Sequence, residues 1–331
     1  MSKRWTRDRI LETAKSFQPA CVLAAAADWD VFTTLDQTPM TATSLAERLG
    51  VNCRATTVLL DALVAMDLLG KSNDAYSVPS EVSELLASSR VNSVLPMVQH
   101  HANCLRRWAQ LSRVIRGGVP AERIPSVRGE AADREAFISA MHTVSGPGAD
   151  DLVAETGPPQ FQHLLDIGGA SGTWTIAFLR ACPEATATIF DLPNVIPQAE
   201  KRIRSAGMAD RTRFVSGDFY TDELPPGADF TWLSAIAHQN SRQQNRDLFL
   251  KISRALANDG WLMIRDIVME ESRTQPVAGA MFAVNMLVAT EGGGTYTYDE
   301  YCQDLASVGF RKIELVRRDA WMNSIIRARN R

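Results

Sequence analysis

The sequence predicts an α/β protein in two parts: an N-terminal helical part with a winged-helix pattern, and a C-terminal doubly wound sheet. Residues 8 to 115 show one helical pattern after another. From residue 163 onward, short apolar strands alternate with helical segments, which is typical of a mostly parallel sheet covered on both faces. Between the two parts, residues 113 to 137 hold glycine, proline and charge, which indicates a loop or a domain boundary.

The helical part begins with an Ala-rich apolar segment at residues 14 to 35. Thr43 or Ser44 is expected to cap a short helix that Gly50 ends. A second helix is predicted from about Arg54 to Asp67, and a polar turn within residues 68 to 78 indicates a small β-wing. The apolar face of that second helix is expected to hold Val58, Leu59, Ala62, Leu63 and Met66.

A winged helix raises the question of DNA binding, and two observations argue against it. Arg54 is the only basic residue of the second helix, whereas base readout and phosphate contacts need several Arg, Asn, Gln or Lys side chains. The net charge of −3, with a pI near 6.0, also lacks the basic stripe of a nucleic-acid binder. The pattern therefore favours a dimerisation module, with no nucleic-acid partner.

Composition indicates a globular protein of the cytoplasm. Apolar residues make up 45% and charged residues 22% of the 331 positions. There is no run of 18 apolar residues that predicts a membrane span, and the charged N-terminus shows no apolar signal core. The five cysteines form no C-x-x-C pair, which argues against a zinc site or a disulfide framework. They lie at Cys21, Cys53, Cys104, Cys182 and Cys302.

The C-terminal part is preceded by a predicted helix at residues 134 to 146, which we expect to bridge the two parts. The last two strands are joined too tightly for a parallel crossover, so they should form an antiparallel hairpin at a sheet edge. Strands are predicted at 163–167, 186–192, 212–219, 228–236, 260–268, 310–318 and 322–330. Helices are predicted at 172–181, 194–206, 241–257 and 298–308, with a helical insertion at 276–290.

The first βα turn of the sheet is rich in glycine. Gly168, Gly169 and Gly172 follow strand 163–167, where ligands bind in doubly wound folds. Glycines let a ligand approach the backbone, and the next helix directs free N–H groups to the same place. Their spacing does not fit G-x-G-x-x-G. Asp166, inside the strand, would repel a pyrophosphate but can hold a cationic or hydroxyl-bearing ligand.

Acidic residues also follow the next two strands. Asp191 lies where a carboxylate can accept bonds from both hydroxyls of a ribose. Asp218 and Phe219 suit the amino group and ring face of an adenine, and Ser234 lies near the end of the fourth strand. Without a phosphate-binding lysine, this set describes a nucleoside that carries positive charge. S-adenosylmethionine has these properties.

The strings LLDIGGASG, FDLPNVI, GDFY and LSAIAH resemble successive motifs of class I methyltransferases, specifically the acetylserotonin-type O-methyltransferases of plant phenylpropanoid and bacterial polyketide pathways. This resemblance implies a winged-helix dimerisation domain at 1–115, a linker and bridging helix at 116–160, and a Rossmann-like seven-stranded methyltransferase domain at 161–331. It also implies a homodimer that uses S-adenosylmethionine. The cofactor residues expected are Asp166, Gly168, Gly169, Asp191, Leu192, Asp218, Phe219 and Ser234.

The resemblance places the catalytic general base at His238. The family motif HDW reads His238-Gln239-Asn240 here. Free phenolate costs roughly 4 kcal/mol at pH 7 for a phenol of pKa ~10, so a base that removes the proton during attack lowers the barrier. Asp266 falls at the position of an acid that orients the base. The family's second acid falls at Thr295, and Glu291 is a candidate to compensate.

We expect the acceptor, a small hydroxylated aromatic or polyketide-like molecule, to lie against helix 135–145, insertion 276–290 and Trp108. The candidate contacts are Met141, His142, Met281, Phe282, Asn285 and Met286. No carboxylate–histidine cluster predicts a metal. Two alternatives stay open: the same scaffold performing hydroxylation, decarboxylation or N- or C-methylation, and a winged-helix regulator. Product labelling from methyl-labelled cofactor tests the first, and a gel shift in low salt tests the second.

Overall fold

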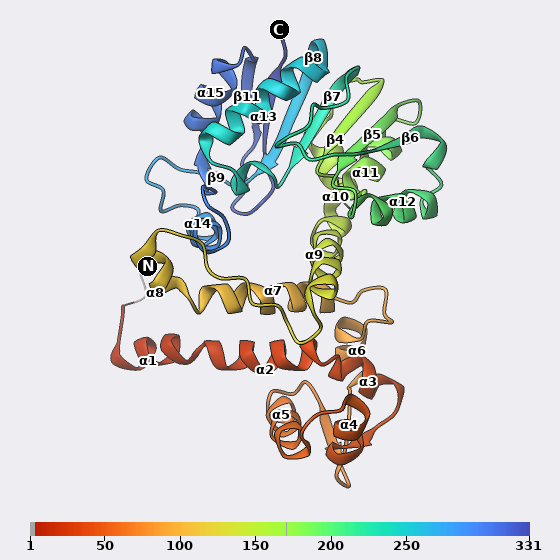
Figure 1. The fold of residues 1–331 in the computed structure, drawn as a ribbon, viewed down its shortest axis with the longest axis vertical. Helices are drawn as coiled ribbons and strands as arrows, with labels where there is room; N and C mark the ends of the chain where they lie inside the picture. Colours follow the sequence, from red (N-terminus) through yellow and green to blue (C-terminus); the bar gives the residue numbers. More distant parts are fainter. Residues whose placement is uncertain (1–3, 170) are drawn as a thin grey trace. The chain divides into compact units, whose positions relative to one another are not determined.

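The computed structural model describes residues 4–169 and 171–331, and it divides the chain into two compact units. The first unit holds residues 4–106 and 123–144, and the second holds 107–122 and 145–331. Figure 1 labels helices α7 (Leu95–Trp108) and α9 (Glu130–Ser145), which end within two residues of the boundaries after residues 106 and 144. No helix among these residues is long and apolar enough to span a bilayer.

The first unit shows the helix–turn–helix–wing order expected from the sequence. Strands β2 (Gly70–Ser72) and β3 (Ala75–Ser77) form the wing, and β1 (Met40–Thr41) pairs with β3 on its other side. The remaining helices before α7 are α1 (Arg7–Lys15), α2 (Phe17–Asp28), α3 (Val31–Gln37), α4 (Ala42–Leu49), α5 (Cys53–Ala65) and α6 (Ser80–Leu86).

Two local expectations for this unit were wrong. Thr41, rather than Thr43 or Ser44, caps α4, because its side chain accepts a hydrogen bond from the Ser44 N–H. Gly50 ends the helix as predicted, at φ +67°. On α5 the buried face is shifted: it holds Thr56, Leu60 and Leu63, whereas Val58 is 61% exposed. Apolar side chains on both sides of α5 made its buried face ambiguous.

The second unit is built on the doubly wound sheet that the sequence predicts. In the part of the chain that the structure describes, the sheet has seven strands in the order β11-β12-β8-β7-β4-β5-β6. The strands β4, β5, β6, β7 and β8 pair with one another in parallel. β12 runs antiparallel to β8, and β11 and β12 form the antiparallel edge hairpin. The strands are β4 (His163–Ile167), β5 (Thr186–Asp191), β6 (Thr212–Ser216), β7 (Ala228–Ser234), β8 (Leu256–Asp266), β11 (Arg311–Arg317) and β12 (Ser324–Arg329).

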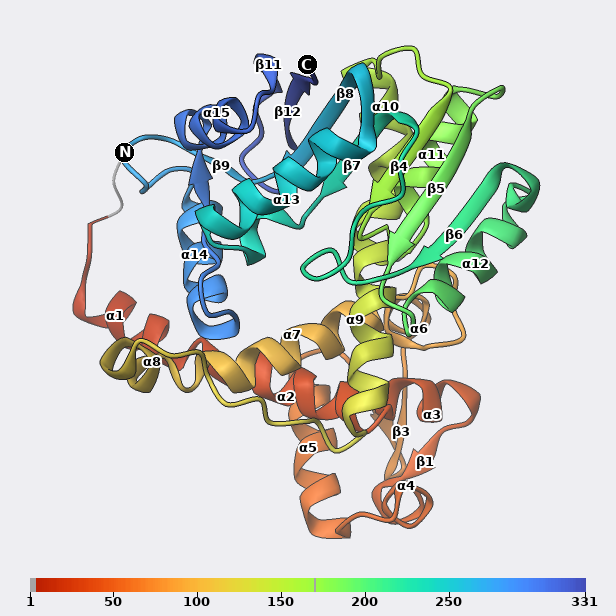
Figure 2. The same cartoon turned by 45° about the horizontal axis from the view of Figure 1, so that its top comes forward.

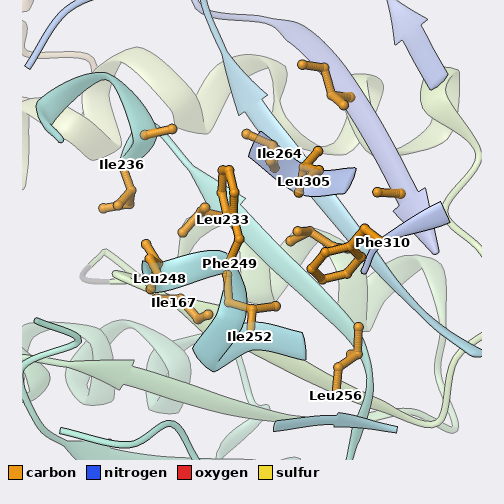
Figure 3. Close-up of a cluster of buried hydrophobic side chains, with 14 of the residues drawn as sticks. Ile167, Leu233, Ile236, Leu248, Phe249, Ile252, Leu256, Ile264, Leu305 and Phe310 are labelled. Atoms are coloured by element: carbon orange, nitrogen blue, oxygen red, sulfur yellow. The ribbon is translucent and has the colours of Figure 1, made fainter. Parts of the chain in front are cut away.

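Helices cover both faces of this sheet (Figure 2). On one face, α13 (Arg242–Ala255) and α15 (Tyr298–Ser307) pack their apolar side chains onto the strands, with Phe249 and Leu305 fully buried (Figure 3). On the other face lie α10 (Ala149–Thr156), α11 (Thr173–Ala181) and α12 (Ile196–Ser205). Because both faces are covered, the central strands are nearly continuous apolar runs.

Three features of the second unit differ from the sequence expectation. Helix α13 ends at Ala255 and β8 begins at once with Leu256, where its register with β7 is irregular. Strand β6 ends at Ser216, so Asp218 lies two residues beyond it. A short parallel pair, β9 (Val268–Met269) with β10 (Tyr296–Thr297), joins the segment after β8 to the segment after α14 (Val277–Ala289). α8 (Leu111–Gly117) also belongs to this unit.

Candidate active site

The predicted site residues of the second unit gather at the carboxyl ends of the strands. Strand β4 lies between β5 and β7, so successive strands are added on opposite sides of it. Such a switch point is where doubly wound sheets bind ligands. The turn after β4, the segment after β5 and the turn after β7 all begin at this edge.

The glycine turn after β4 requires glycine for two reasons. Gly168 has φ +67°, and a Cβ there would lie 2.6 Å from Ile236 Cδ1, in the segment after β7. Gly172 also has φ +67° and packs against Ile203 of α12. Arg202 Nη1 donates to the Ser171 carbonyl at 2.8 Å. The turn is therefore held between the β7 segment and α12, and its Ala170 lies outside the described residues.

Asp166 lies beneath this turn and is only 1% exposed. Thr175 Oγ1 donates to its Oδ2 at 2.7 Å, and a Cβ at Gly169 would lie 2.7 Å from the same oxygen. Burial raises the pKa of Asp166 to about 7, with the Thr175 hydroxyl lowering it and Asp191 raising it further. Its position supports the turn, and direct contact with a ligand stays a prediction.

The other predicted cofactor residues line the same edge and are more open. Asp191 ends β5, and its Oδ1 accepts the Leu192 N–H at 2.7 Å, while the Leu192 side chain is 42% exposed. Asp218 Oδ1 accepts the Tyr220 N–H at 2.9 Å. Phe219 packs against the core with its ring 4.6 Å from that of Tyr220. Carboxylates and aromatic rings of this kind suit a nucleoside, whose hydroxyls and amino group would donate to the acids and whose base would stack on a ring.

Ser234, at the end of β7, has a partner that the sequence did not reveal. Arg265 Nη1 donates to Ser234 Oγ at 3.1 Å, its Nε donates to Asn323 at 2.8 Å, and its guanidinium lies 4.7 Å from the Trp174 ring centroid. Burial lowers the pKa of Arg265 to about 10. Ser234 of β7 is paired with Arg265 of the neighbouring parallel strand β8, so their side chains lie on the same face of the sheet.

His238 and Asp266 form a buried pair, 9% and 1% exposed. His238 lies in a short 3₁₀ turn after β7, and Asp266 is the last residue of β8. The imidazole Nδ1 lies 2.9 Å from Asp266 Oδ1 and 3.1 Å from Oδ2. The carboxylate also accepts the backbone N–H groups of His238, at 3.1 Å, and Ile267, at 2.8 Å. A neutral His238 therefore carries its proton on Nδ1, where it donates to the Asp266 carboxylate, and Nε2 is the nitrogen that can accept a proton.

Asn240, which stands in place of the family's Trp, is fully buried and bonded on every side. Its Oδ1 accepts the Tyr220 hydroxyl at 2.5 Å, and its Nδ2 donates to Asn245 Oδ1 at 3.0 Å. Its carbonyl accepts the Tyr296 hydroxyl. The segment after β6 and the 3₁₀ turn of His238 are thus joined by a direct hydrogen bond through Tyr220.

The two candidates for a second acid lie differently. Thr295 is buried, and its hydroxyl donates to the Gly279 carbonyl of α14 at 3.4 Å, which is a weak hydrogen bond. Glu291 is exposed in the loop after α14. Among the described residues, Asp266 is therefore the acid bonded to the His238 ring.

The acceptor candidates of the second unit lie on α14. The Phe282 ring stands edge-on to His238, with ring centroids 4.8 Å apart. Asn285 Oδ1 accepts the Trp108 Nε1–H at 2.9 Å, and Met281 is 52% exposed. Met286, by contrast, is 6% exposed and packs in the interior. Met141 and His142 lie on α9, in the other unit. Within the described ranges, no cluster of His, Cys, Asp and Glu has the arrangement of a metal site.

This fold and site define a nucleoside-binding enzyme with a buried His–Asp pair beside the ligand edge. A model of the O-methyltransferase domain matches residues 125–311, and one of the O-methyltransferase dimerisation domain matches residues 11–89. The chain belongs to the O-methyltransferase family. It is therefore an enzyme of a family that uses S-adenosylmethionine as its methyl donor.

Individual relatives agree with this assignment. The chain is 30% identical to the tetracenomycin polyketide synthesis 8-O-methyltransferase of Streptomyces glaucescens, over 92% of this chain and 91% of that protein. It is 29% identical to a 3-hydroxy-5-methyl-1-naphthoate 3-O-methyltransferase of Streptomyces sahachiroi, over 89% and 87%. Human N-acetylserotonin methyltransferase, solved in complex with S-adenosylmethionine, shares the fold at a TM-score of 0.79 and 24% identity, over 100% and 99%. Further relatives methylate nitrogen or carbon.

Proposed function

We propose that this chain transfers a methyl group from S-adenosylmethionine to a hydroxyl of a small aromatic or polyketide-like metabolite, with His238 as the general base. It acts as a homodimer in the cytoplasm. The observation that carries the proposal is the His238–Asp266 pair, buried at the carboxyl edge of the sheet next to the glycine turn. The naphthoate and polyketide O-methyltransferases among the relatives support the acceptor class.

The residues at the sheet edge would hold the cofactor through its nucleoside. The Asp191 carboxylate accepts the ribose hydroxyls, and Asp218 with Phe219 receives the adenine. The backbone of Gly168 and Gly169 allows close approach to the amino-acid end. When bound, S-adenosylmethionine supplies a methyl carbon made electrophilic by its sulfonium.

His238 removes the acceptor's proton as the new bond forms. The acceptor hydroxyl would give its proton to His238 Nε2 as its oxygen takes up the methyl group that bound S-adenosylmethionine would supply, leaving S-adenosylhomocysteine. The Asp266 carboxylate stabilises the imidazolium that results, and its two backbone donors keep it from rotating. Phe282 covers the ring edge-on and limits the access of water.

Because some relatives methylate nitrogen or carbon, the test identifies the atom that receives the methyl group. A panel of hydroxynaphthoates is incubated with the enzyme and methyl-tritiated cofactor, and the products are identified by mass spectrometry and NMR. Label on oxygen supports the proposal. Label on nitrogen or carbon, or a product without label, contradicts it.

The variant His238→Ala tests the base. We expect kcat to fall by about 10²- to 10⁴-fold, the usual contribution of general-base catalysis, because the variant lacks the Nε2 atom that takes the proton. Calorimetry should give an unchanged affinity for S-adenosylmethionine, since His238 contributes to proton removal and not to the nucleoside site. Full activity in the variant would remove His238 as the base. Absence of cofactor binding by the folded parent protein would contradict the proposal as a whole.

A further inference from the structure

The loop between α14 and α15 packs directly on the turn that carries His238. This loop contains Gly292, Gly293 and Gly294 in succession. The Gly294 N–H donates to the His238 carbonyl at 2.8 Å. A Cβ at Gly293 would lie 2.5 Å from Thr290 Oγ1, 2.6 Å from the His238 carbonyl oxygen and 2.9 Å from that of Gln239. Real Cβ atoms essentially never show contacts under 3.0 Å, so the loop can approach the His238 turn this closely because residue 293 has no side chain.

Neither side of this contact is free to move away. Asn245 Nδ2 donates to the Ala237 carbonyl at 2.9 Å, and Tyr296 donates its hydroxyl to the Asn240 carbonyl, so the 3₁₀ turn is held at both ends. On the loop side, Thr290 Oγ1 accepts the Gly293 N–H at 2.9 Å and donates to the Met286 carbonyl of α14.

The far end of the loop is anchored next to Asp266. Tyr296 pairs with Val268 in the β9–β10 ladder, two residues after Asp266. One loop therefore contacts the backbone of His238 and also joins the strand segment that follows its carboxylate partner.

We propose that Gly293 is a positioning residue for His238. Its missing side chain lets the loop approach until the Gly294 N–H fixes the His238 peptide, while Asp266 fixes the ring. This inference rests on the proposed role of His238 as the base. The φ angle of Gly293 lies outside the left-handed range, so an added methyl group acts through the contact and not through backbone strain.

The variant Gly293→Ala is the direct test. A methyl group there would clash with the two carbonyls and with Thr290 Oγ1, and we expect the loop to shift away from the turn, which breaks the Gly294–His238 hydrogen bond and moves the imidazole. We expect kcat to fall at least 10-fold, because a displacement of about 1 Å can cost roughly 10²-fold in rate. The affinity for S-adenosylhomocysteine and the KM for the methyl donor should stay within about twofold of the parent. An unchanged kcat would overturn the inference.

Two glycine variants serve as comparisons. Gly148→Ala adds a methyl group where nothing lies within 4 Å and should leave kcat unchanged. Gly294→Ala keeps its N–H, and its Cβ would meet only the Tyr296 hydroxyl at 4.0 Å, so it should lose much less activity than Gly293→Ala. Equal losses at 293 and 294 would indicate a general effect on the loop and overturn the specific role of Gly293.

The double variant Gly293→Ala/His238→Ala separates this inference from the proposed function. If Gly293 acts through His238, its substitution adds little further loss once the imidazole is gone. Multiplicative losses overturn the positioning role even if His238 is the base. Full activity of the single variant His238→Ala would refute the role of His238 as the base, and this result does not depend on the Gly293 variants.

A second pair of variants keeps the test open if Gly293→Ala does not fold. Thr290→Val removes the oxygen that accepts the Gly293 N–H, and Thr290→Ser keeps it. We expect Thr290→Val to lose kcat at constant affinity for S-adenosylhomocysteine and Thr290→Ser to retain it. Equal activity of these two variants would contradict the positioning role of the loop.

Discussion

Asp166 lies in the interior of the second unit, where ionising its carboxyl group lowers the free energy of unfolding. Its carboxyl group is 1% exposed, and burial raises its pKa from 3.8 to about 7. An acid whose pKa rises on folding binds its proton more tightly in the folded state. Its contribution to stability is therefore complete below pH 4, declines as the pH rises from about 4 to 7, and is lost above pH 7.

We predict that Asp166→Asn becomes more stable relative to the parent as the pH rises. The amide is neutral at every pH and keeps the size of the carboxyl group. The difference in the free energy of unfolding should shift in favour of the variant by about 1 kcal/mol per pH unit between pH 5 and 7. Urea unfolding of the cofactor-free protein at pH 5, 6, 7 and 8 measures this. The same change at the exposed Asp247 controls for net charge, and a pH-independent difference would contradict the prediction.

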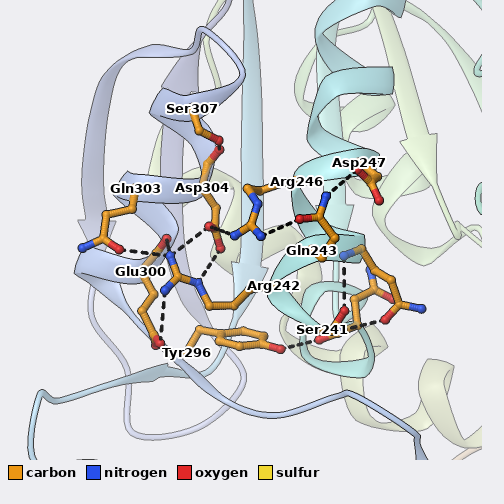
Figure 4. A network of polar contacts seen from close by, with 12 residues as sticks. Ser241, Arg242, Gln243, Arg246, Asp247, Tyr296, Glu300, Gln303, Asp304 and Ser307 are labelled. Atoms are coloured by element: carbon orange, nitrogen blue, oxygen red, sulfur yellow. Dashed lines mark hydrogen bonds and ion pairs between the residues drawn. The ribbon is translucent and has the colours of Figure 1, made fainter.

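At the scale of elements, α13 and α15 are joined by a polar network as well as by their apolar faces (Figure 4). Asp304 of α15, 4% exposed, accepts hydrogen bonds from Arg242 at 2.8 and 2.9 Å and from Arg246 at 2.9 Å. Arg242 begins α13 four residues after His238, directly behind the Ser241 capping box. The network thus fixes the helix start that follows the candidate base.

We predict that Asp304→Asn lowers the free energy of unfolding by about 1–3 kcal/mol. The variant leaves two arginines without their shared anion, but both side chains are about one third exposed, so water offsets part of the loss. Denaturant titration measures the change. Glu314→Gln is the matched control, because the Glu314 side chain is 54% exposed, whereas Asp304 is buried, and its pair with Arg327 should contribute at most about 1 kcal/mol. Equal losses in the two variants would show that burial of Asp304 contributes nothing extra.

The elements of the sheet could be predicted because each carries a strong local pattern. Strands such as β4 and β5 are apolar runs buried on both faces, and the amphipathic helices between them repeat with a helical period. Some of the errors lie where a distant segment decides the local structure. The β9–β10 pair depends on Tyr296 meeting Val268, and no local pattern shows that pairing.

The same distinction applies to the site. The proximity of His238 and Asp266 could be expected, because β7 and β8 are adjacent parallel strands and their carboxyl ends meet at one edge. The contact of Gly293 with the His238 carbonyl could not, since it depends on the path of a loop between two helices. The three consecutive glycines were the one signal of it in the sequence.

At the scale of the whole molecule, the N-terminal helices show apolar side chains that the single chain does not bury. Ile10 and Leu11 of α1 are 56% and 48% exposed, and Phe17 of α2 is 55% exposed. The dimerisation-domain model matches residues 11–89, which include Leu11 and Phe17, and Ile10 lies directly before that segment. Exposed apolar patches of this kind mark protein interfaces. The proposed homodimer would bury them.

We predict that the double variant Ile10→Glu/Phe17→Glu dissociates the dimer. Each substitution occurs twice in a symmetric pair and places a carboxylate in an apolar contact, so the dissociation constant should rise by roughly 10³-fold or more. Sedimentation velocity at micromolar concentration measures the change from dimer to monomer. Trp321→Glu, an exposed aromatic between β11 and β12, is the control and should remain dimeric. A dimeric double variant would place the interface elsewhere, and a monomeric parent protein would refute the homodimer.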